Sequence, residues 1–468
     1  MKSPEPFLYE CLSATFLQSY PKHRLIIFFC IPSRDDPSLP VLEKLLQDHP
    51  GFDTRILVED EDPYLTQQKL GPNPKIRNMS RAYREAKGDI IWILDCNIWV
   101  GRDVAGRMVD LLCGFASPTL SNTAGTSKKY KFVHQLPLVT EMQGALQHSS
   151  SLLTEGGGAL EELFLSTSHA KFYTAINTVA IAPCIIGKSN MFRRSHLNAL
   201  TTSPSSPLKG IDHFSFNICE DHLLAALLWT SPMPSEVLAS SALEGRDPLV
   251  SNTSIPPPHS LTRAQRSKGE EWNWGNHALL PPHPSNLAIQ PLTPSSLPSY
   301  LSRRTRWLRV RKFTVTAATL VEPGTESLLC SAYGAYAITT LPYFQQWGAP
   351  QTWLGMLALW IAMVAAWAVV DHWVWSMLQD WPRSSIHDED DEEEGRLPRR
   401  QTVGKAEWLA AWLGREILAF PIWAWAFWGG VSVVWRGRRF SVGVDMKVRD
   451  IGPVEEEAVG VDGKRKGL

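Results

Sequence analysis

Residues 89–94, which read DIIWIL, constrain the fold more than any other stretch of this chain. The run is apolar on both faces, and this predicts a buried strand rather than a surface strand. It stops at Asp95, and residues 79–87 before it have the spacing of an amphipathic helix. Ligands of open α/β sheets bind just beyond the carboxyl ends of the strands. We therefore expect Asp95 to meet a ligand, and Lys75, at the entry of the helix, to lie at the same edge.

Strand and helix patterns alternate along the first part of the chain. Strand patterns at 25–30 and 54–58 are separated by a helix pattern at 39–48, and a further helix pattern lies at 8–17. This alternation predicts a parallel or mostly parallel sheet. The expected fold class is therefore α/β, with a sheet flanked by helices in a domain that covers residues 1–320.

Residues 231–300 differ from the rest of that domain because proline, serine and asparagine are dense there. Such a stretch cannot bury enough apolar surface to offset the entropy that it loses on ordering. We expect an inserted loop in which short strands remain at 239–243 and 272–279.

The chain becomes strongly apolar after the basic residues 302–312. Three segments, 327–347, 352–378 and 408–435, are each long and apolar enough to cross a hydrocarbon layer of ~30 Å, which takes roughly 20 residues. We expect membrane-associated helices over residues 321–440, with an exposed acidic and basic linker at 380–405 and a loose charged tail at 441–468.

The charges near the third segment limit the topology. If the domain is cytosolic, three full spans would put the basic residues 435–439 on the far side, against the positive-inside tendency. One segment is therefore expected to be re-entrant or interfacial. The third, which contains Arg415, Glu416 and Pro421, is the best candidate.

Composition excludes several classes of protein. The formal net charge of −1 gives no reason to expect nucleic-acid binding. The seven cysteines have no CxxC spacing, which argues against a zinc site or a disulfide scaffold and suits a reducing compartment. The first thirty residues lack the pattern of a signal peptide, so we expect none.

Four motifs that are far apart in the sequence carry a resemblance to a known family. They are Asp36 after the first strand, the run NPK before the helix and strand that end in Asp95, the pair Glu220-Asp221, and the basic motif RxxRW at 303–307. Together they resemble the GT-A glycosyltransferases of family 2 and its relatives, and most of all the ceramide glucosyltransferases of family 21. The resemblance extends from about residue 7 to residue 440.

On the donor side, the resemblance implies UDP-glucose as the substrate. Asp36 would contact the uridine or ribose, and Asp95 would hold the diphosphate with a divalent cation, Mg²⁺ or Mn²⁺, as its metal ligand. Lys75 would aid the diphosphate, and His169 is similar to a family histidine near the active site. The triplet Asp95-Cys96-Asn97 departs from the family's DxD-like pattern at its third position, which weakens the support for the metal.

On the acceptor side, the resemblance implies transfer to the primary hydroxyl of ceramide with inversion. Asp221 would be the catalytic base, with Glu220 as its support. Arg303 and Arg306 would steady the leaving diphosphate, because a guanidinium group binds phosphate oxygens with two parallel hydrogen bonds. Trp307 would form a wall of the acceptor site.

Taken singly, each candidate has a plain structural explanation. Asp36 precedes a proline, as turn residues often do. Asp221 lies in the first turn of a predicted helix, where the macrodipole favours an acidic residue in any case. The basic motif precedes a membrane segment and fits the positive-inside tendency. Lys75 and His169 are also compatible with an ordinary solvated lysine and an ordinary histidine.

The resemblance also implies a location and two alternatives. We expect a multi-pass protein of the Golgi or ER membrane whose catalytic domain faces the cytosol. Family members usually begin with an anchor and a first nucleotide-contacting strand upstream of the helix at 8–17, so an unpaired sheet edge is expected here. The alternatives are a processive family-2 polysaccharide synthase and a catalytically inactive membrane protein.

Overall fold

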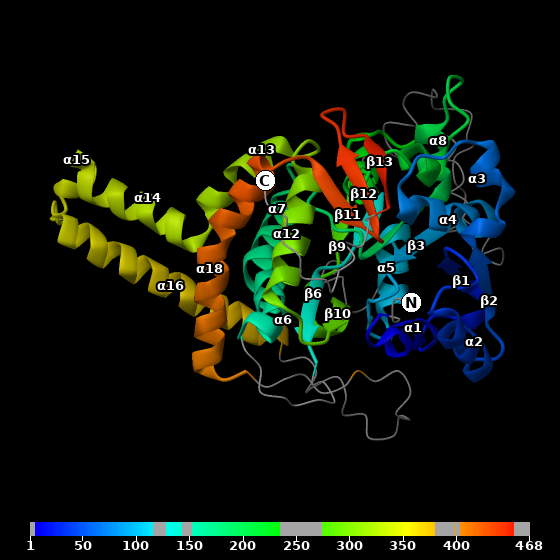
Figure 1. Ribbon diagram of the computed structural model, residues 1–468, viewed down its shortest axis with the longest axis horizontal. Coiled ribbons are helices and arrows are strands. Elements are labelled where there is room, and N and C mark those ends of the chain that lie inside the picture. Colours follow the sequence, from blue (N-terminus) through cyan, green and yellow to red (C-terminus); the bar gives the residue numbers. More distant parts are fainter. Residues whose placement is uncertain are drawn as a thin grey trace, which may run out of the picture.

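The structure is a computed structural model that describes residues 5–115, 128–142, 152–234, 274–379, 397 and 403–453. An α/β body holds both the first and the last strands, and helices α14 and α16 extend together from one side of it (Figure 1). Most of the predicted insertion, including the strand expected at 239–243, lies outside the described residues. The same holds for most of the predicted linker and for the tail beyond residue 453.

The first unit of the body has the predicted alternation of strand and helix. Strands β1 (Ile26–Ile31) and β2 (Asp53–Val58) pair in parallel. They are joined through α2 (Leu39–Asp48), whose bounds agree with the sequence prediction. Helix α1 (Leu8–Phe16) shares one apolar core with all three elements.

The central sheet has four strands in the order β3-β7-β5-β9. These are β3 (Ile90–Leu94), β7 (Ser189–Arg193), β5 (Phe132–His134) and β9 (Ala278–Leu279). The β3–β7 and β5–β7 pairs are antiparallel, and only β5–β9 is parallel. The prediction of a mostly parallel sheet is therefore wrong for this part of the fold, because alternation along the chain does not determine which strands become neighbours.

Strand β3 separates two apolar cores, as its sequence predicts. Ile90, Trp92 and Leu94 contact the core that includes α5, and Ile91 and Ile93 contact the core that includes α4 and α9. All five residues are nevertheless only half-buried, since β3 is the end strand of its sheet among the described residues. The prediction of a buried strand is therefore confirmed for the two faces and wrong for the edge, because an apolar pattern reports what the faces contact and not whether both edges are paired.

Short strands also form in part of the predicted insertion. β8 (Trp274–Gly275) pairs with β4 (Lys129–Tyr130), and β10 (Ala288–Leu292) pairs with β6 (Pro137–Glu141), both in parallel. The strand expected near 272–279 is thus confirmed. The loop was predicted to continue to residue 300, but it gives way to ordered strands before that point.

The predicted tail is ordered as far as Pro453. β11 (Ser432–Trp435), β12 (Arg438–Val442) and β13 (Val448–Pro453) form an antiparallel sheet. Its apolar side chains, among them the fully buried Phe440, share a core with Ile218, just before α9. The expectation of a loose chain after residue 440 is therefore wrong for this segment.

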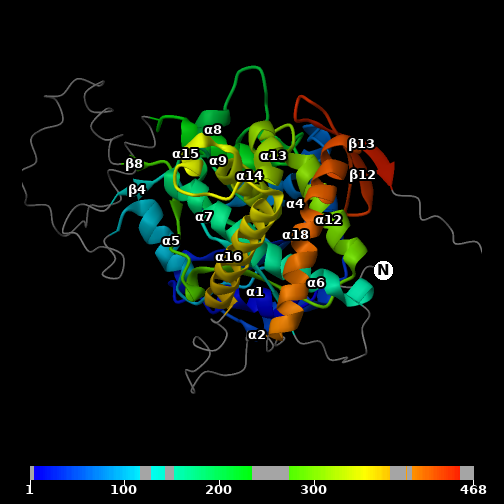
Figure 2. The same ribbon diagram turned by 90° about the vertical axis from the view of Figure 1, so that its left-hand side faces the viewer.

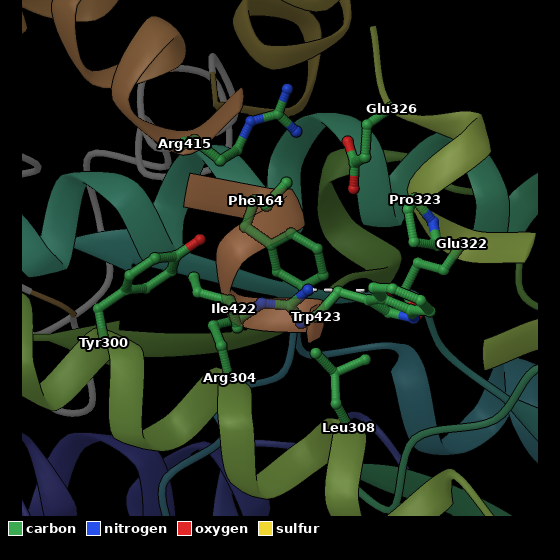
Figure 3. Close-up of a pocket in the computed structure, with 11 residues that line it drawn as sticks. Phe164, Tyr300, Arg304, Leu308, Glu322, Pro323, Glu326, Arg415, Ile422 and Trp423 are labelled. Atoms are coloured by element: carbon green, nitrogen blue, oxygen red, sulfur yellow. Dashed lines mark ion pairs between the residues drawn. The ribbon is translucent and has the colours of Figure 1, made fainter. Parts of the chain in front are cut away.

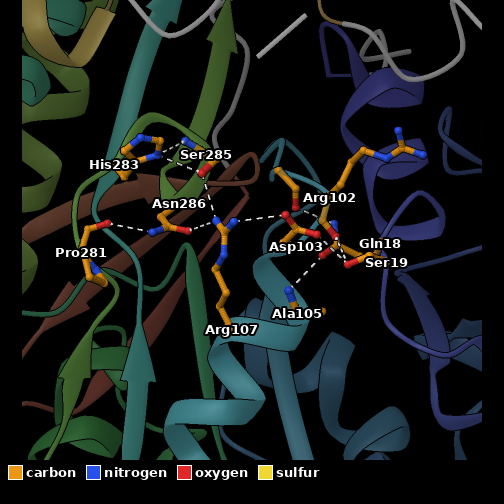
Figure 4. A network of polar contacts seen from close by, with 11 residues as sticks. Gln18, Ser19, Arg102, Asp103, Ala105, Arg107, Pro281, His283, Ser285 and Asn286 are labelled. Atoms are coloured by element: carbon orange, nitrogen blue, oxygen red, sulfur yellow. Dashed lines mark hydrogen bonds and ion pairs between the residues drawn. The ribbon is translucent and has the colours of Figure 1, made fainter. Parts of the chain in front are cut away.

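Several helices pack against these sheets, among them α4 (Pro74–Glu85), α5 (Val104–Cys113), α8 (Arg194–Thr201) and α9 (Glu220–Thr230). The short helix α3 (Pro63–Gln67) precedes α4 in the chain. A polar network holds the start of α5 in place (Figure 4). Gln18 at the end of α1 accepts the N–H of Ala105, and Arg107 donates to Asn286 at 2.6 Å. The network therefore links the first unit to the segment that precedes β10.

One long helical stretch changes its geometry near the centre of the body. It consists of α6 (Leu152–Phe164), a π-helical turn at Leu165–His169 and α7 (Ala170–Val179). The first part packs against α12 (Leu297–Arg311), which carries the RxxRW motif. π-Helical turns within α-helices are frequent at functional sites.

The three predicted membrane segments differ from one another in the structure. Helix α14 (Ser327–Thr340) has 14 residues, which is about 21 Å at 1.5 Å per residue. Helix α16 (Trp353–Gln379) has 27 residues and is the one helix, among the described residues, that is long and apolar enough to span a membrane. The short helices α13 (Thr316–Val321) and α15 (Pro342–Gln345) lie on either side of α14 in the chain.

Helix α18 (Lys405–Trp428) corresponds to the third predicted membrane segment, and among the described residues it does not combine the length and hydropathy expected of a span. Its buried face includes Arg415 and Glu416 and packs against α6 and α12. Its other face exposes apolar residues at helical spacing, namely Leu409, Leu413, Ile417, Phe420, Trp425 and Trp428. In Figures 1 and 2 the helix lies across the base of the α14–α16 pair. The expectation that this segment is interfacial stays a prediction.

Buried ion pairs connect helices α16 and α18 to the body. Asp371 of α16 is 1% exposed and pairs with Lys171 of α7 and, at 3.2 Å, with Arg415 of α18. Figure 3 shows Arg415 and Arg304 beside a small hollow between α12 and α18. Breaking a buried pair leaves an uncompensated charge, which is strongly destabilising. The helices that would meet a bilayer are therefore held firmly against the body.

Candidate active site

The start of α4 is tied to the start of α9 through one asparagine. The side-chain oxygen of Asn73 accepts the backbone N–H groups of Lys75 and Ile76, which caps the helix. Its amide nitrogen donates to Glu220 at 3.0 Å. The helix begins at Pro74, earlier than predicted, because this cap and a proline at the first position favour an early start. Lys75 is consequently part of the first turn.

Asp95 lies between two lysines at the carboxyl end of β3. Its Oδ1 is 2.7 Å from Lys75 Nζ, and its Oδ2 is 3.1 Å from Lys188 Nζ. The β3–β7 ladder explains the second contact, since Leu94 is opposite Ser189 and the N–H of Asp95 donates to the carbonyl of Lys188. The structure thus brings together the predicted pair Lys75 and Asp95. It adds Lys188, which the sequence analysis did not identify.

The three charges shift one another's pKa values. Burial raises the pKa of Asp95, but the two ammonium groups lower it more, so the net pKa is below the ordinary value. Burial lowers the pKa of Lys75, and Asp95 with Glu220 reverses this to a net increase. Burial also lowers the pKa of Lys188, and there Asp95 offsets only part of the effect because Arg303 and Lys75 add repulsion. The site therefore places two ammonium groups around one carboxylate, with Arg303 close enough to Lys188 to lower its pKa.

Gly187, next to Lys188 in the chain, places Asp221 of α9 beside the same lysine cluster. A Cβ atom at this position would be 3.0 Å from Asp221 Oδ2 and 3.0 Å from Lys75 Nζ. Lys75 Nζ also donates to the carbonyl of Gly187 at 2.6 Å. Asp221 and Lys75 therefore both adjoin the short backbone segment before β7, and a glycine there leaves room for both side chains.

The neighbouring carboxylates Glu220 and Asp221 have different environments. Glu220 is buried beneath α4, and burial together with the Asp221 charge raises its pKa to about 7. Asp221 is half-buried beside Gly187. Two carboxyl groups in unlike surroundings suit two different roles. This arrangement favours Asp221 as the group that faces a substrate and Glu220 as its support.

The basic motif on α12 borders the same region. Arg303 donates to Gln290 at 2.9 Å, pairs with Glu161 at 3.1 Å and lies over the ring of Trp307, 5.1 Å from its centroid. Trp307 and Lys188 line one hollow together with Ile98, Pro137, Leu138, Leu165, Ile186 and Gln290. Burial and the charge of Arg303 lower the pKa of Arg306. The motif therefore adjoins Lys188 across a small, largely apolar hollow.

His169 ends the π-helical turn in a mostly apolar setting. Its ring lies between Phe164 and Tyr173, and burial lowers its pKa to about 3, with Arg304 adding to the effect. The imidazole is therefore neutral. Its Nδ1 atom is buried and has no hydrogen-bond partner among the described residues. These features suit a hydrogen bond to an uncharged group more than a contact with a phosphate.

Asp36 is not brought to this cluster by any contact within the described residues. Its carboxylate accepts the N–H of Ser38 at 2.9 Å and also the Ser38 hydroxyl. This is the behaviour of a turn residue that leads into α2. Its role toward the nucleotide remains a prediction.

The described residues do not fit the expected divalent cation well. Both oxygens of Asp95 are already paired with ammonium groups. In the described part of the chain, no three His, Cys, Asp or Glu side chains are grouped as metal ligands. Mg²⁺ and Mn²⁺ prefer several oxygen ligands around one ion. We therefore derive no chemical step through a metal.

Comparisons with known proteins identify the family. The profile of Glycosyl transferase family 21 matches residues 1–239 and 284–448. The chain is a member of glycosyltransferase family 21. The gap in the match falls inside the predicted insertion, and the resemblance inferred from the four motifs is confirmed.

Two curated relatives match nearly the whole chain. The ceramide glucosyltransferase of Pyricularia oryzae is 45% identical over 471 residues, which cover 96% of this chain and 84% of that protein. The ceramide glucosyltransferase of Gibberella zeae is 38% identical and covers 97% of this chain and 85% of its own length. A solved mannosyltransferase from Pyrobaculum calidifontis, in complex with GDP-Man and Mn²⁺, covers 80% of this chain and 85% of its own at 15% identity. Its TM-score of 0.35 is too low to support an argument.

Proposed function

We propose that this protein is a ceramide glucosyltransferase, an enzyme of sphingolipid metabolism that transfers glucose from UDP-glucose to ceramide. The observation that carries the proposal is the 45% identity to a curated ceramide glucosyltransferase over 96% of the chain. The cluster of Lys75, Asp95, Lys188 and Asp221 supports it, because a nucleotide-sugar transferase needs cations for the leaving diphosphate and a base for the acceptor.

The donor is proposed to bind at the carboxyl end of β3. Asp95 fixes the ammonium group of Lys75 at 2.7 Å, and fixed cations near a leaving group stabilise the charge that develops there. Asp36 is proposed to contact the uridine or ribose. His169 is proposed to form a hydrogen bond with an uncharged part of the nucleotide sugar. The family resemblance implies a divalent cation at Asp95, but both oxygens of this carboxylate are already paired with ammonium groups.

Asp221 is proposed to be the catalytic base. It takes the proton of the primary hydroxyl of ceramide, and the oxygen attacks the anomeric carbon from the face opposite to UDP. The bond between glucose and the diphosphate breaks, and the products are the β-glucoside and UDP. Glu220, which accepts a hydrogen bond from Asn73, supports the first turn of α9 and so the position of the base.

The basic motif is proposed to hold the leaving group and the acceptor. Arg303 and Arg306 steady the diphosphate, and Trp307, over which the guanidinium group of Arg303 lies, forms a wall of the acceptor site.

Helices α16 and α18 are proposed to hold the site at the surface of a bilayer. Helix α16 is the candidate span among the described residues, and α18 exposes an apolar face. Ceramide would then reach the site from the bilayer itself. We propose an integral protein of the Golgi or ER membrane whose α/β body faces the cytosol.

Product analysis tests this function. The full chain is purified from membranes and given radiolabelled UDP-glucose with ceramide in lipid micelles. We expect a labelled, lipid-soluble glucosylceramide. A labelled polymer would favour a polysaccharide synthase, and UDP-glucose binding without any product, or no binding, would favour an inactive membrane protein.

A further inference from the structure

The ammonium group of Lys188, beside the proposed substrate site, can form a further hydrogen bond. Its ammonium group has three N–H donors. In the described part of the chain they meet Asp95 Oδ2 at 3.1 Å and, at the long distance of 3.4 Å, Asn97 Oδ1. The side chain is 16% exposed. One charge-assisted hydrogen bond to a ligand at this surface can therefore still form.

A purely structural ion pair does not require this arrangement. Asp95 is already compensated by Lys75 at 2.7 Å, and the first turn of α4 holds that lysine in place. A second buried cation adds a desolvation cost and brings repulsion from Lys75 and Arg303. An anion that arrives between these cations would remove the repulsion. A cluster of cations at the carboxyl end of a strand is therefore better explained by an anionic ligand than by stability alone.

We propose that Lys188, together with Lys75, binds the diphosphate of the nucleotide donor from the two sides of Asp95. This inference rests on the proposed function and adds to it a residue that the four sequence motifs do not include. Asp95 is then a positioning residue, since it holds both ammonium groups in place before the donor arrives. The two ammonium groups also supply the charge compensation for which the family resemblance implied a divalent cation.

Loss of the Lys188 charge should weaken the binding of UDP and not the binding of uridine. Lys188→Met removes the charge and keeps an unbranched side chain of similar length. Because one hydrogen bond to a charged group is lost, the affinity for UDP is expected to fall about 10- to 100-fold. The affinity for uridine, which has no phosphate, should stay the same. Lys188→Arg keeps the charge and should restore part of the UDP affinity.

Isothermal titration of the purified full chain with UDP and with uridine measures both affinities. Lys209→Met is the matched control, because Lys209 is an exposed lysine in the loop before residues 210–214. Thermal unfolding of each variant shows whether it is folded. If Lys188→Met is folded and the affinities for UDP and uridine change equally, or neither changes, the proposal is overturned.

The same preparations separate this proposal from the proposed function. Wild-type protein that makes glucosylceramide while Lys188→Met binds UDP normally would refute the role of Lys188 alone. Wild-type protein that binds UDP through Lys188 but makes no glucosylceramide would refute the proposed function alone.

Discussion

Replacement of Gly187 by alanine tests whether Lys75 and Asp221 meet at one point. The added Cβ would be 3.0 Å from Asp221 Oδ2 and 3.0 Å from Lys75 Nζ, so both groups have to move by a few tenths of an ångström. A misplacement of ~1 Å can lower catalysis by about 100-fold. For the smaller displacement we expect kcat to fall roughly 10-fold, with little change in the midpoint of thermal unfolding.

The matched control for this prediction is Gly106→Ala in α5. A Cβ at Gly106 meets nothing within 4 Å, and the position is inside a helix. Alanine is there expected to stabilise the fold by about 0.5–1 kcal/mol and to leave kcat unchanged. Glucosylceramide formation at saturating UDP-glucose measures both variants. Normal turnover of Gly187→Ala would refute the reasoning, because it would mean that the two side chains do not converge on this backbone segment.

Two further predictions follow from the charges of the site. The pKa of Glu220 is raised from 4.5 to about 7, so its contribution to stability is present at low pH and is lost as the pH rises through 7. The free energy of unfolding of Glu220→Gln should therefore increase by roughly 1–3 kcal/mol relative to that of wild type between pH 5 and pH 8. A difference in unfolding midpoint that stays constant over this pH range would argue against the prediction. Lys75 and Lys188 compensate the diphosphate, so excess EDTA should lower turnover by less than about 10-fold, whereas a loss of more than about 100-fold would assign that role to a metal.

The sequence predicted the local elements and most of the candidate residues of the site. The bounds of α2 and the end of β3 at Asp95 could be found because apolar periodicity and polar boundaries are local properties. Lys75 could be placed near Asp95 because the helix that carries it leads directly into the strand. The family resemblance added Asp221 and the basic motif, which no local pattern distinguishes from a solvated helix start or a membrane-flanking charge cluster.

The remaining features depend on pairing between distant segments. Lys188 meets Asp95 only because β7 pairs antiparallel to β3 with Leu94 opposite Ser189, and a sequence does not display that register. The strand β10 (Ala288–Leu292) contains a proline and follows a proline-rich stretch, so composition predicted a loop where pairing with β6 forms a strand. The C-terminal sheet pairs strands that are neighbours in the chain, and it was missed because its charged sequence contains only a few buried positions, such as Phe440.

The most direct test of the central claim measures UDP-glucose affinity and glucosylceramide formation on the same preparations of wild type and Asp221→Asn. Loss of a general base costs about 10²- to 10⁴-fold in rate. The account predicts a loss of that size in turnover with an affinity for UDP-glucose close to that of wild type. Near-normal turnover in a folded Asp221→Asn protein would contradict it.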